Sequence, residues 1–481
     1  MNSIKKNIIY NIAYQMLIVF VPFITSPYLS RTLGAEKIGV YSFTYSIVFY
    51  FMMLSMLGIN NYGNRSIAKV RDNTEKLSKE FLSIYAIQCF MSIIMMILYI
   101  VYIIFSAEKY NIIAIIQGVY ILSTALDITW FFYGLEDFKI VIIRNTIVKI
   151  VTLLSILTFV KSPNDLWIYT LIMGGSTLLG QIITWPLVFK KIILIKIKFN
   201  DIIPHIKPIF ILFIPVLAIS VFSYMDKIML GSISDMKETG FYENTDKIIS
   251  IPKSIISALG TVMLPRTAHM IAIGKEKKSK EYIENTMFYV LWISLAFTFG
   301  LAGIANVFAP VFWGESFKEC GILITYMAPA LIFSVFGNVI RTQFLIPRSM
   351  DKDYSWSLVW GAIINFIVNI CLIPKFGARG AVIGTLCAEF SLCFYQTYVV
   401  RQYLNIKEYL RTGIVFLPIS LLMFIVLKFI GKVLSPNITT LAIQITIGAF
   451  IYLTFSIIYI YKSNNKVVIR IREMITKKDR V

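Results

Sequence analysis

The sequence predicts an all-α protein that crosses a membrane about fourteen times. Of its 481 residues, 57% are hydrophobic and only 15% are charged. Apolar windows of about 20 residues, long enough to cross a hydrocarbon layer of roughly 30 Å, recur from Ile8 to Tyr461. The polar breaks between them are short and leave no room for a sizeable water-soluble lobe. A polytopic membrane protein is therefore expected.

The spans and their orientation follow from hydropathy and charge. Hydropathy places the spans near residues 8–30, 38–60, 81–105, 111–133, 139–160, 166–189, 208–232, 239–264, 284–308, 319–345, 354–373, 380–400, 412–434 and 438–461. The first apolar segment has no small-residue cleavage site and continues past Pro22 and Pro27, so we expect a retained helix. Lys and Arg concentrate in alternate loops, and cytoplasmic loops carry the excess of these residues. This alternation predicts an even number of spans and two cytoplasmic termini.

Two segments of the chain resemble each other. PYLSRTLGAEKIGVYSFTYSI, Pro27 to Ile47, and SYMDKIMLGSISDMKETGFYENTDKI, Ser223 to Ile248, both close one span with Leu-Gly and open the next with Gly-x-Tyr. The copies are six predicted spans apart and so share one orientation, as in transporters built from parallel repeats. The repeat predicts two six-helix lobes plus two C-terminal helices. The predicted divisions are an N-lobe (1–190), a basic cytoplasmic linker (191–207), a C-lobe (208–403), two further spans (404–461) and a basic cytoplasmic tail (462–481).

Charged side chains inside the spans are the candidate site. Such groups are costly in a membrane and usually face a bundle interior or a water-filled cavity. In ETGFYENTDKIISIPKSIISALGTVMLPR, Glu238 to Arg266, polar residues recur every three or four positions, which places them on one stripe of a helix. Lys253 lies midway along this span. The candidate substrate-binding cations are Lys253, Lys247, Lys227, Arg341, Arg31, Lys149 and Arg144, and the candidate ion-coupling acids are Asp127, Asp226, Asp246 and Glu389.

Several of these residues also have a purely structural explanation. Arg31, Asp226, Lys227 and Glu243 lie within about two turns of the predicted outer face, where long side chains reach the interface and pair there. Arg144 and Arg341 could likewise reach the inner face. The basic loops are topology determinants first and contacts for anionic membrane lipids second.

Other classes of function are disfavoured. The net charge of +20 could suggest nucleic acid, but the basic residues form short clusters between apolar segments rather than one amphipathic face. The sequence has no Walker A motif, and its two histidines, His205 and His269, lie in predicted cytoplasmic loops. No group of residues resembles a metal site or a Ser/His/Asp triad. We therefore expect no nucleic acid, no metal, no cofactor, no direct use of ATP and no enzymatic activity.

Four stretches carry a resemblance to a known family. They are PYLSRTLGAEKIGVYSF; LDITWFFYGLEDFKIVIIRN, Leu126 to Asn145; DKIMLG followed by TGFYENTDKI and VMLPR; and IPKFGARGAVIGTLCAEF, Ile373 to Phe390. With these, the chain resembles the Wzx-type flippases for polysaccharide repeat units, within the multidrug/oligosaccharidyl-lipid/polysaccharide exporter superfamily. The resemblance covers most of the first 390 residues, and it implies a multidrug-exporter-like fold with a cation-lined cavity.

The resemblance also implies a function. The expected cargo is a polyprenyl-pyrophosphate-linked oligosaccharide repeat unit, moved from the inner to the outer leaflet of a bacterial cytoplasmic membrane for capsular or other surface polysaccharide. Alternating access between the lobes is the expected mechanism, with a proton or sodium ion as a candidate coupling ion and the glycan polymerase of the same pathway as a candidate partner. A multidrug or small-molecule exporter of the same superfamily is the first alternative. A membrane glycan polymerase or ligase is the second, disfavoured because every predicted outer loop is short.

Overall fold

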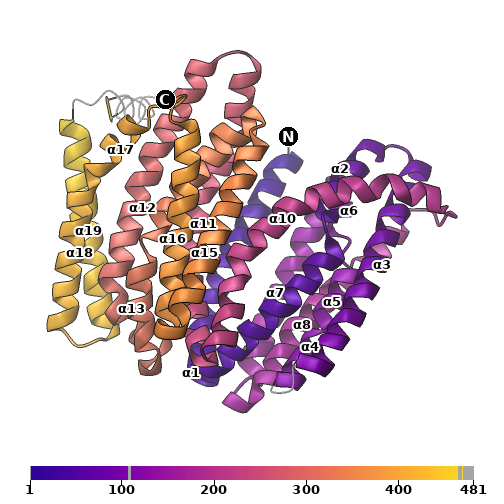
Figure 1. Cartoon of the computed structure of the whole chain (residues 1–481), viewed down its shortest axis with the longest axis horizontal. Coiled ribbons are helices and arrows are strands. Elements are labelled where there is room, and N and C mark those ends of the chain that lie inside the picture. Colours follow the sequence, from indigo (N-terminus) through magenta and orange to yellow (C-terminus); the bar gives the residue numbers. More distant parts are fainter. Residues whose placement is uncertain (1, 107–109, 464–467, 470–481) are drawn as a thin grey trace. The chain divides into compact units, whose positions relative to one another are not determined.

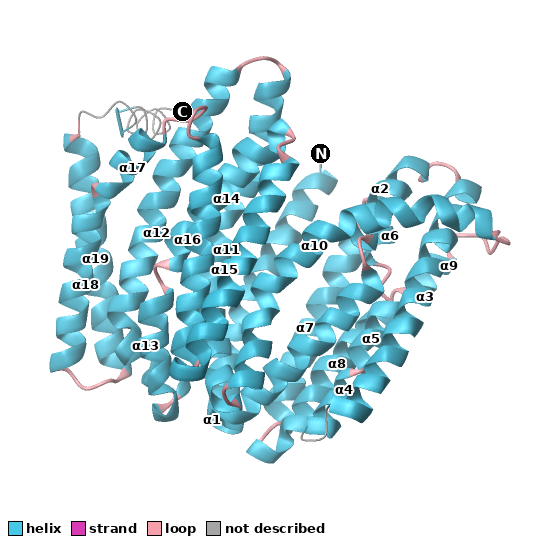
Figure 2. Cartoon of the chain, viewed as in Figure 1, coloured by secondary structure: helices cyan, strands magenta, loops and turns pink. Residues whose placement is uncertain are grey.

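The computed structural model describes residues 2–106, 110–463 and 468–469 (Figure 1). The described residues form helices joined by short loops and turns (Figure 2), which confirms the predicted all-α class. Packing divides the chain into two compact units, Met1–Gly240 and Phe241–Val481, and each is described by itself. Lys109 and most of the predicted basic tail lie outside the described residues.

The first unit is a helical bundle with an aromatic core. Its elements are α1 (Asn2–Met56), α2 (Ile59–Val70), α3 (Thr74–Ser106), α4 (Asn111–Gln117), α5 (Val119–Ala125), α6 (Thr129–Gly134), α7 (Phe138–Phe159), η2 (Pro163–Asp165), α8 (Leu166–Ile182), α9 (Trp185–Phe189), α10 (Phe199–Ile233) and the start of α11 (Met236–Ala272). The buried Trp130 donates a hydrogen bond to Gln88 at 3.0 Å and stacks on Phe81. Gly63 admits this indole, since a Cβ there would lie 2.4 Å from the ring. A packed aromatic core therefore ties α2, α3 and α6 together.

Glycines explain the sequence signal that the two repeats share. Gly34, at φ +77°, interrupts α1 between the first two predicted spans, a conformation that glycine adopts without steric penalty. Gly39 and Gly240 hold matching positions in the repeated segments, and each faces the other segment's backbone. A Cβ on Gly39 would lie 1.6 Å from the Met236 carbonyl oxygen, and a Cβ on Gly240 would lie 1.9 Å from that of Ala35. The Gly-x-Tyr signal thus marks a reciprocal close contact between α1 and the start of α11.

The second unit contains the rest of α11 and the helices that follow it. These are α12 (Glu276–Trp313), η3 (Glu315–Phe317), α13 (Lys318–Met327), α14 (Ala330–Ile340), the π-helical turn η4 (Arg341–Leu345), η5 (Ile346–Arg348), α15 (Asp351–Phe376), α16 (Ala378–Val400), α17 (Ile406–Ile414), α18 (Phe416–Val433) and α19 (Ile438–Lys462). The run IPKFGARGAVIGT forms the tight hairpin between α15 and α16. Gly377 turns the chain at φ +53°, and a Cβ on Gly384 would lie 2.0 Å from the Asn369 side-chain oxygen. Small residues therefore bring these two helices into close contact.

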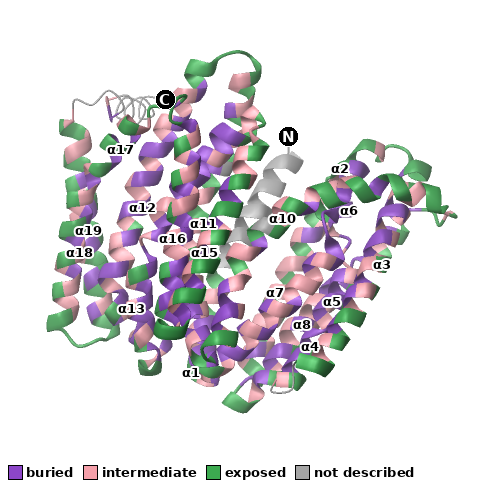
Figure 3. Cartoon of the chain, viewed as in Figure 1, coloured by how far each residue is buried: buried purple, intermediate pink, exposed green. Residues whose placement is uncertain are grey.

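The number of spans differs from the predicted one. The described residues contain twelve helices long and apolar enough to cross a membrane, so the count of about fourteen is not confirmed. The first two predicted spans lie together in α1, which bends at Gly34. The predicted span 380–400 forms α16, which is not among the twelve because Glu389, Gln396 and its tyrosines lower its mean hydropathy. Many helix faces nonetheless expose apolar side chains, such as Phe105 (78% exposed) and Phe450 (70%), as expected of surfaces that contact lipid (Figure 3).

The compact units divide the chain at a different place from the predicted lobes. The predicted seventh span, 208–232, lies in α10, which packs on α1, α2 and α3 within the first unit. The predicted lobes describe the repeat and not the packing, so their boundaries stay a prediction. In the second unit, α18 and α19 pack against α12, where the Tyr452 hydroxyl donates to the Trp292 carbonyl oxygen at 2.6 Å.

Candidate functional site

An ion pair between α11 and α16 is the centre of the charged cluster in the second unit. The Lys253 ammonium lies 2.6 Å from a Glu389 carboxylate oxygen, with the Lys253 side chain 42% exposed and that of Glu389 11% exposed. A second contact joins the same two helices, because the Tyr242 hydroxyl of α11 and the Thr385 hydroxyl of α16 lie 2.8 Å apart. The structure thus joins a predicted cation to a predicted ion-coupling acid, although 136 residues separate them in the chain.

Further predicted residues surround this pair. Asp246 and Arg341 are both close enough to act electrostatically on the Lys253 ammonium. Gly260 lets α14 approach α11, since a Cβ there would lie 2.5 Å from the Asn338 side-chain oxygen. Arg341 begins the π-helical turn that follows, with its guanidinium 5.7 Å from the centre of the Tyr354 ring. Wide turns of this kind are frequent at functional sites.

Lys247 pairs along its own helix. Its ammonium lies 3.0 Å from Glu243, one turn earlier on α11. The second unit therefore gathers the cations Lys247, Lys253 and Arg341 with the acids Glu243, Asp246 and Glu389 on three neighbouring helical segments. A half-exposed ammonium that is paired with a carboxylate can exchange that partner for another anion, and charge-assisted bonds to phosphate are as strong as those to carboxylate.

A separate hydrogen-bonded network contains Arg144 and Asp127 in the first unit. The Thr129 hydroxyl and backbone N–H both donate to the Asp127 carboxylate, at 2.5 and 2.9 Å. The Arg144 guanidinium donates to the same Thr129 hydroxyl at 3.4 Å and to the Gln181 side chain at 2.7 Å. Two predicted residues thus meet through Thr129, and Asp127 lies in a turn that its own side chain stabilises.

The remaining predicted residues are distributed over the first unit. Asp226 and Lys227 on α10 are buried, with 2% and 8% of each residue exposed. The Lys227 ammonium lies 5.7 Å from the centre of the Tyr224 ring, within reach of a cation–π interaction. Arg31 is exposed on α1. Lys149 is half-buried midway along α7, and within the described part of the chain no ion pair or hydrogen bond engages its ammonium.

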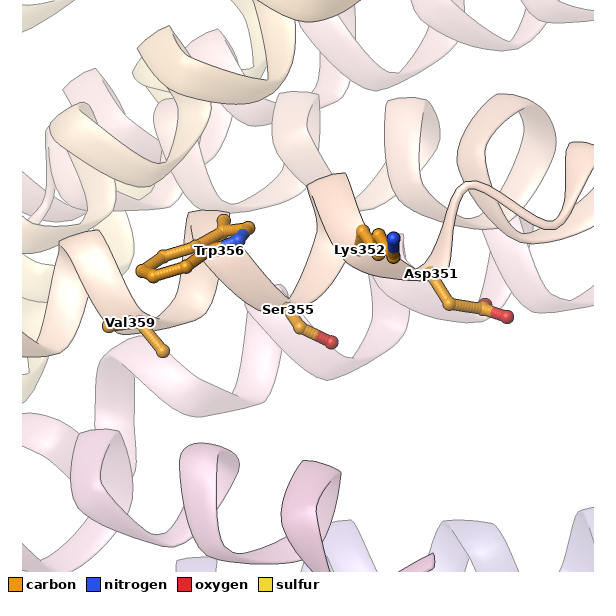
Figure 4. A pocket seen from close by; sticks show the side chains of 5 residues that line it. All are labelled: Asp351, Lys352, Ser355, Trp356 and Val359. Atoms are coloured by element: carbon orange, nitrogen blue, oxygen red, sulfur yellow. The ribbon is translucent and has the colours of Figure 1, made fainter. Parts of the chain in front are cut away.

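Two hollows lie on helices of the second unit. An apolar hollow of about 340 Å³ lies between α12, α18 and α19, lined by residues that include Gly300, Met423, Leu427, Gln444, Gly448 and Tyr452. Another, of about 300 Å³, lies beside the first turns of α15, where Asp351, Lys352, Ser355, Trp356 and Val359 follow one helix (Figure 4). Trp beside Lys is typical of helix ends at a membrane–water interface. We interpret this second hollow as interfacial surface outside the charged cluster.

The sequence did not identify several members of these networks. Thr129 could have been found, because a Thr two residues after an Asp is a common turn pattern. Gln181 and Tyr354 give no local signal, since only tertiary packing brings them to their arginines. Nor does any group of three or more His, Cys, Asp or Glu occur among the described residues that could hold a metal ion.

Comparisons with known proteins agree with this architecture. The model of the family described as "Polysaccharide biosynthesis protein" matches residues 4–271, more than half of the chain. A protein of Shigella dysenteriae named "Putative O-antigen transporter" is 24% identical over 403 residues, which cover 82% of this chain and 100% of that protein.

Solved structures show the same fold. The structure titled "Lipid II flippase MurJ, inward closed conformation" superimposes with a TM-score of 0.74 at 17% identity, over 94% of this chain and 99% of that one. An inward-facing multidrug resistance MATE family transporter of the MOP superfamily superimposes with a TM-score of 0.57 at 12% identity, over 82% and 99%. These likenesses confirm the predicted multidrug-exporter-like fold.

Proposed function

The chain belongs to the polysaccharide biosynthesis protein family, and from this premise we propose that it is a flippase for lipid-linked oligosaccharides. Its cargo is a polyprenyl pyrophosphate that carries an oligosaccharide repeat unit. The protein moves this cargo from the inner to the outer leaflet of a bacterial cytoplasmic membrane by alternating access, for capsular or other surface polysaccharide. Its relative and its structural neighbours are named as transporters and a flippase, which supports a transporter rather than an enzyme.

The Lys253–Glu389 pair is the observation that carries this proposal. A pyrophosphate needs cations in a place sheltered from water, where charge-assisted bonds are strong. Lys253 supplies a cation whose carboxylate partner is nearly buried, at 11% exposed, while its own side chain is 42% exposed and so accessible to a ligand, with Arg341 near it. We infer that the cargo pyrophosphate displaces Glu389 from Lys253 as it binds. The pair then re-forms when the cargo leaves, which returns the site to its starting state.

The other predicted residues act at other stages of transport in this proposal. Lys247, Lys227 and Arg31 contact the anion nearer the outer face, and Arg144 and Lys149 contact it at further stages. Asp127, Asp226, Asp246 and Glu389 are the candidate groups for a coupled proton or sodium ion. The membrane potential also contributes, because outward movement of an anion across an inside-negative membrane is favourable by about 2.3 kcal/mol per charge per 100 mV.

The apolar hollow between α12, α18 and α19 suits the hydrocarbon part of the same cargo. Gly300 and Gly448 line this hollow together with Met423 and Leu427. Because lipid tails are as apolar as the side chains that line the hollow, this contact contributes van der Waals packing rather than a hydrophobic gain. We include this hollow in the proposal as a contact for the polyprenyl tail.

Replacement of Lys253 tests the proposal directly. In a strain that lacks the chromosomal gene, we expect Lys253→Ala to insert normally but to lower surface polysaccharide at least about tenfold, because loss of one charge-assisted bond costs roughly 1.5–3 kcal/mol. Lipid-linked repeat units should accumulate with glycans that a lectin cannot reach in intact spheroplasts. Lys428→Ala is the matched control, since Lys428 is another half-buried membrane lysine of the second unit but lies on α18, outside the cluster.

The same strains separate the alternatives. Normal surface polysaccharide with Lys253→Ala, at wild-type protein level, would contradict the role of this lysine. In the deletion strain itself, repeat units exposed on the outer surface as unpolymerised single units would indicate a polymerase or ligase. Intact surface glycan after deletion would indicate a drug or small-molecule exporter.

A further inference from the structure

A group of aromatic rings lies between α1 and α10 in the first unit. The Tyr224 ring of α10 stacks on the Phe49 ring of α1, with centroids 3.8 Å apart and planes 20° apart. Tyr45, one turn earlier on α1, places its ring 6.2 Å from that of Tyr224, and Tyr50 lies beside Phe49 at 6.4 Å. These four residues, Tyr45, Phe49, Tyr50 and Tyr224, are here called the aromatic platform. All four are partly exposed.

A second layer of rings fixes the platform from behind. Tyr120 packs its edge on Tyr45 at 5.1 Å, and its hydroxyl lies 2.8 Å from the hydroxyl of Tyr41. Tyr41 in turn stacks on Tyr45 at 5.8 Å and packs on Tyr169 at 4.7 Å. Tyr120 and Tyr169 are buried, with 3% and 8% exposed, in contrast to the platform rings. Tyr120 and Tyr169 are therefore core residues. Tyr41 is partly exposed like the platform rings, of which Tyr45, Phe49 and Tyr50 pack against the core and keep part of their surface accessible.

The position of the platform is unlike that of a lipid-facing aromatic belt. Tyr and Trp that contact lipid gather at the two ends of membrane helices, where the hydroxyl or indole N–H reaches water. Phe49 and Tyr50 instead lie in the middle of the predicted span 38–60. The buried charges of Asp226 and Lys227 follow Tyr224 on the same helix, and such charges face the protein interior rather than lipid. Partly exposed rings beside buried charges are suited to a ligand that is both amphipathic and flat.

Sugar rings have this character. The C–H groups of a pyranose form an apolar face that packs on an aromatic ring, while its hydroxyls point outward and need polar partners. The platform supplies both kinds of contact. Ser220 and Asp226 lie beside the Tyr50 hydroxyl, and the Lys227 ammonium is 5.7 Å from the Tyr224 ring centre. Apolar walls with a few fixed polar groups are the usual composition of a small-molecule site.

We propose that the aromatic platform of Tyr45, Phe49, Tyr50 and Tyr224 binds a sugar ring of the cargo oligosaccharide. This inference rests on the proposed flippase function and adds a carbohydrate subsite to it. Pyrophosphate recognition at Lys253 and sugar recognition at the platform are then separate contributions, because the two sets of residues belong to different helices of different units. Lys227, beside Tyr224, contacts the pyrophosphate at another stage of transport. A ligand that lacks sugars should bind without using the platform.

The test compares two ligands on the full-length protein in lipid nanodiscs. One is undecaprenyl pyrophosphate, which has no sugar, and the other is the lipid-linked oligosaccharide extracted from the deletion strain. We expect Tyr224→Leu to weaken binding of the oligosaccharide lipid about tenfold while undecaprenyl pyrophosphate changes less than about twofold. Tyr224→Phe, which keeps the ring, should retain binding of both. Phe308→Leu is the matched control, because Phe308 forms a similarly stacked pair with Phe312 on α12, at 4.8 Å and 20°.

The remaining results of the binding test distinguish the carbohydrate subsite from the proposed function. Unchanged binding of both ligands by Tyr224→Leu, or equal loss of both, would overturn the carbohydrate subsite and leave the proposed function standing. Loss of both ligands with Lys253→Gln, together with selective loss in Tyr224→Leu, would support both proposals. If the wild-type protein bound neither ligand, the proposed function would fail, and the carbohydrate subsite with it.

Discussion

At the scale of the residue, the Lys253–Glu389 pair illustrates how a charge within a membrane protein can be paired and still be accessible to a ligand. An unpaired ammonium within a membrane is costly, and opening a fully buried pair would leave two uncompensated charges. Here the carboxylate is nearly buried and the ammonium is half-exposed. The exposed partner can therefore accept a new anion while the acid stays in place.

Replacement of Glu389 should reveal this competition. We expect Glu389→Gln to bind undecaprenyl pyrophosphate about tenfold more tightly, because the amide no longer competes as an anion. Transport should nevertheless slow, since nothing then displaces the pyrophosphate from Lys253. Equilibrium binding in nanodiscs and flipping in proteoliposomes measure the two effects. Glu319→Gln is the matched control, because Glu319 pairs with Arg379 of α16 at the same distance of 2.6 Å but outside the cluster. Weaker binding by Glu389→Gln would contradict the competition.

The residues of the site show which part of it could be predicted from the sequence. Helical spacing on one segment made Lys247 and Lys253 candidates, because charges inside an apolar span are visible without tertiary information. The pairing of Lys253 with Glu389 was not assignable, since 136 residues separate them and only helix packing brings them together. The aromatic platform was not predicted at all. Aromatic residues are common in membrane helices, and only the ring geometry distinguishes a platform from ordinary core.

At the scale of the element, the reciprocal contact of Gly39 and Gly240 explains why the Gly-x-Tyr pattern occurs twice. Spans were predicted at nearly the right places from hydropathy, but the bend at Gly34 and the polar residues of α16 made their number uncertain. Hydropathy reports burial in lipid and carries no information about whether one helix continues through a bend. The contact between the repeats, by contrast, depends on residues that hydropathy treats as neutral.

The contact between Gly39 and the start of α11 predicts that the stability of the protein is sensitive to a larger side chain at this position. We expect Gly39→Ala to destabilise the protein by roughly 1–3 kcal/mol, since the new methyl group would overlap the Met236 carbonyl and force the helices apart. Gly175→Ala on α8 is the control, because nothing lies within 4 Å of a Cβ there and alanine is the better helix former. Thermal unfolding of both variants in detergent, followed by loss of the monodisperse peak in size-exclusion chromatography, measures the difference. Equal unfolding temperatures for the two variants would show that the contact is not tight.

At the scale of the whole molecule, the net charge of +20 bears on orientation in the membrane. The basic segments alternate with nearly neutral ones, and basic loops stay on the cytoplasmic side. Arg71 and Lys79 pair with Glu136 and Asp201 at 2.7 and 2.8 Å. These exposed pairs contribute little to stability, so we attribute the excess of cations mainly to topology.

Reporter fusions test the predicted orientation of the chain. A green fluorescent protein fused after Lys462 should fluoresce, because this reporter folds in the cytoplasm, whereas alkaline phosphatase fused at the same point should be inactive. The reverse pattern is expected for fusions after Asn437, in the loop between α18 and α19. Neutralising Lys190, Lys191, Lys196 and Lys198 together should reduce the difference between the two fusion sites. These lysines favour a cytoplasmic location for the loop in the middle of the chain. A fluorescent fusion after Asn437, or an active phosphatase after Lys462, would mean that the chain has the opposite orientation at its end, and the cytoplasmic assignment of the C-terminus would then be wrong.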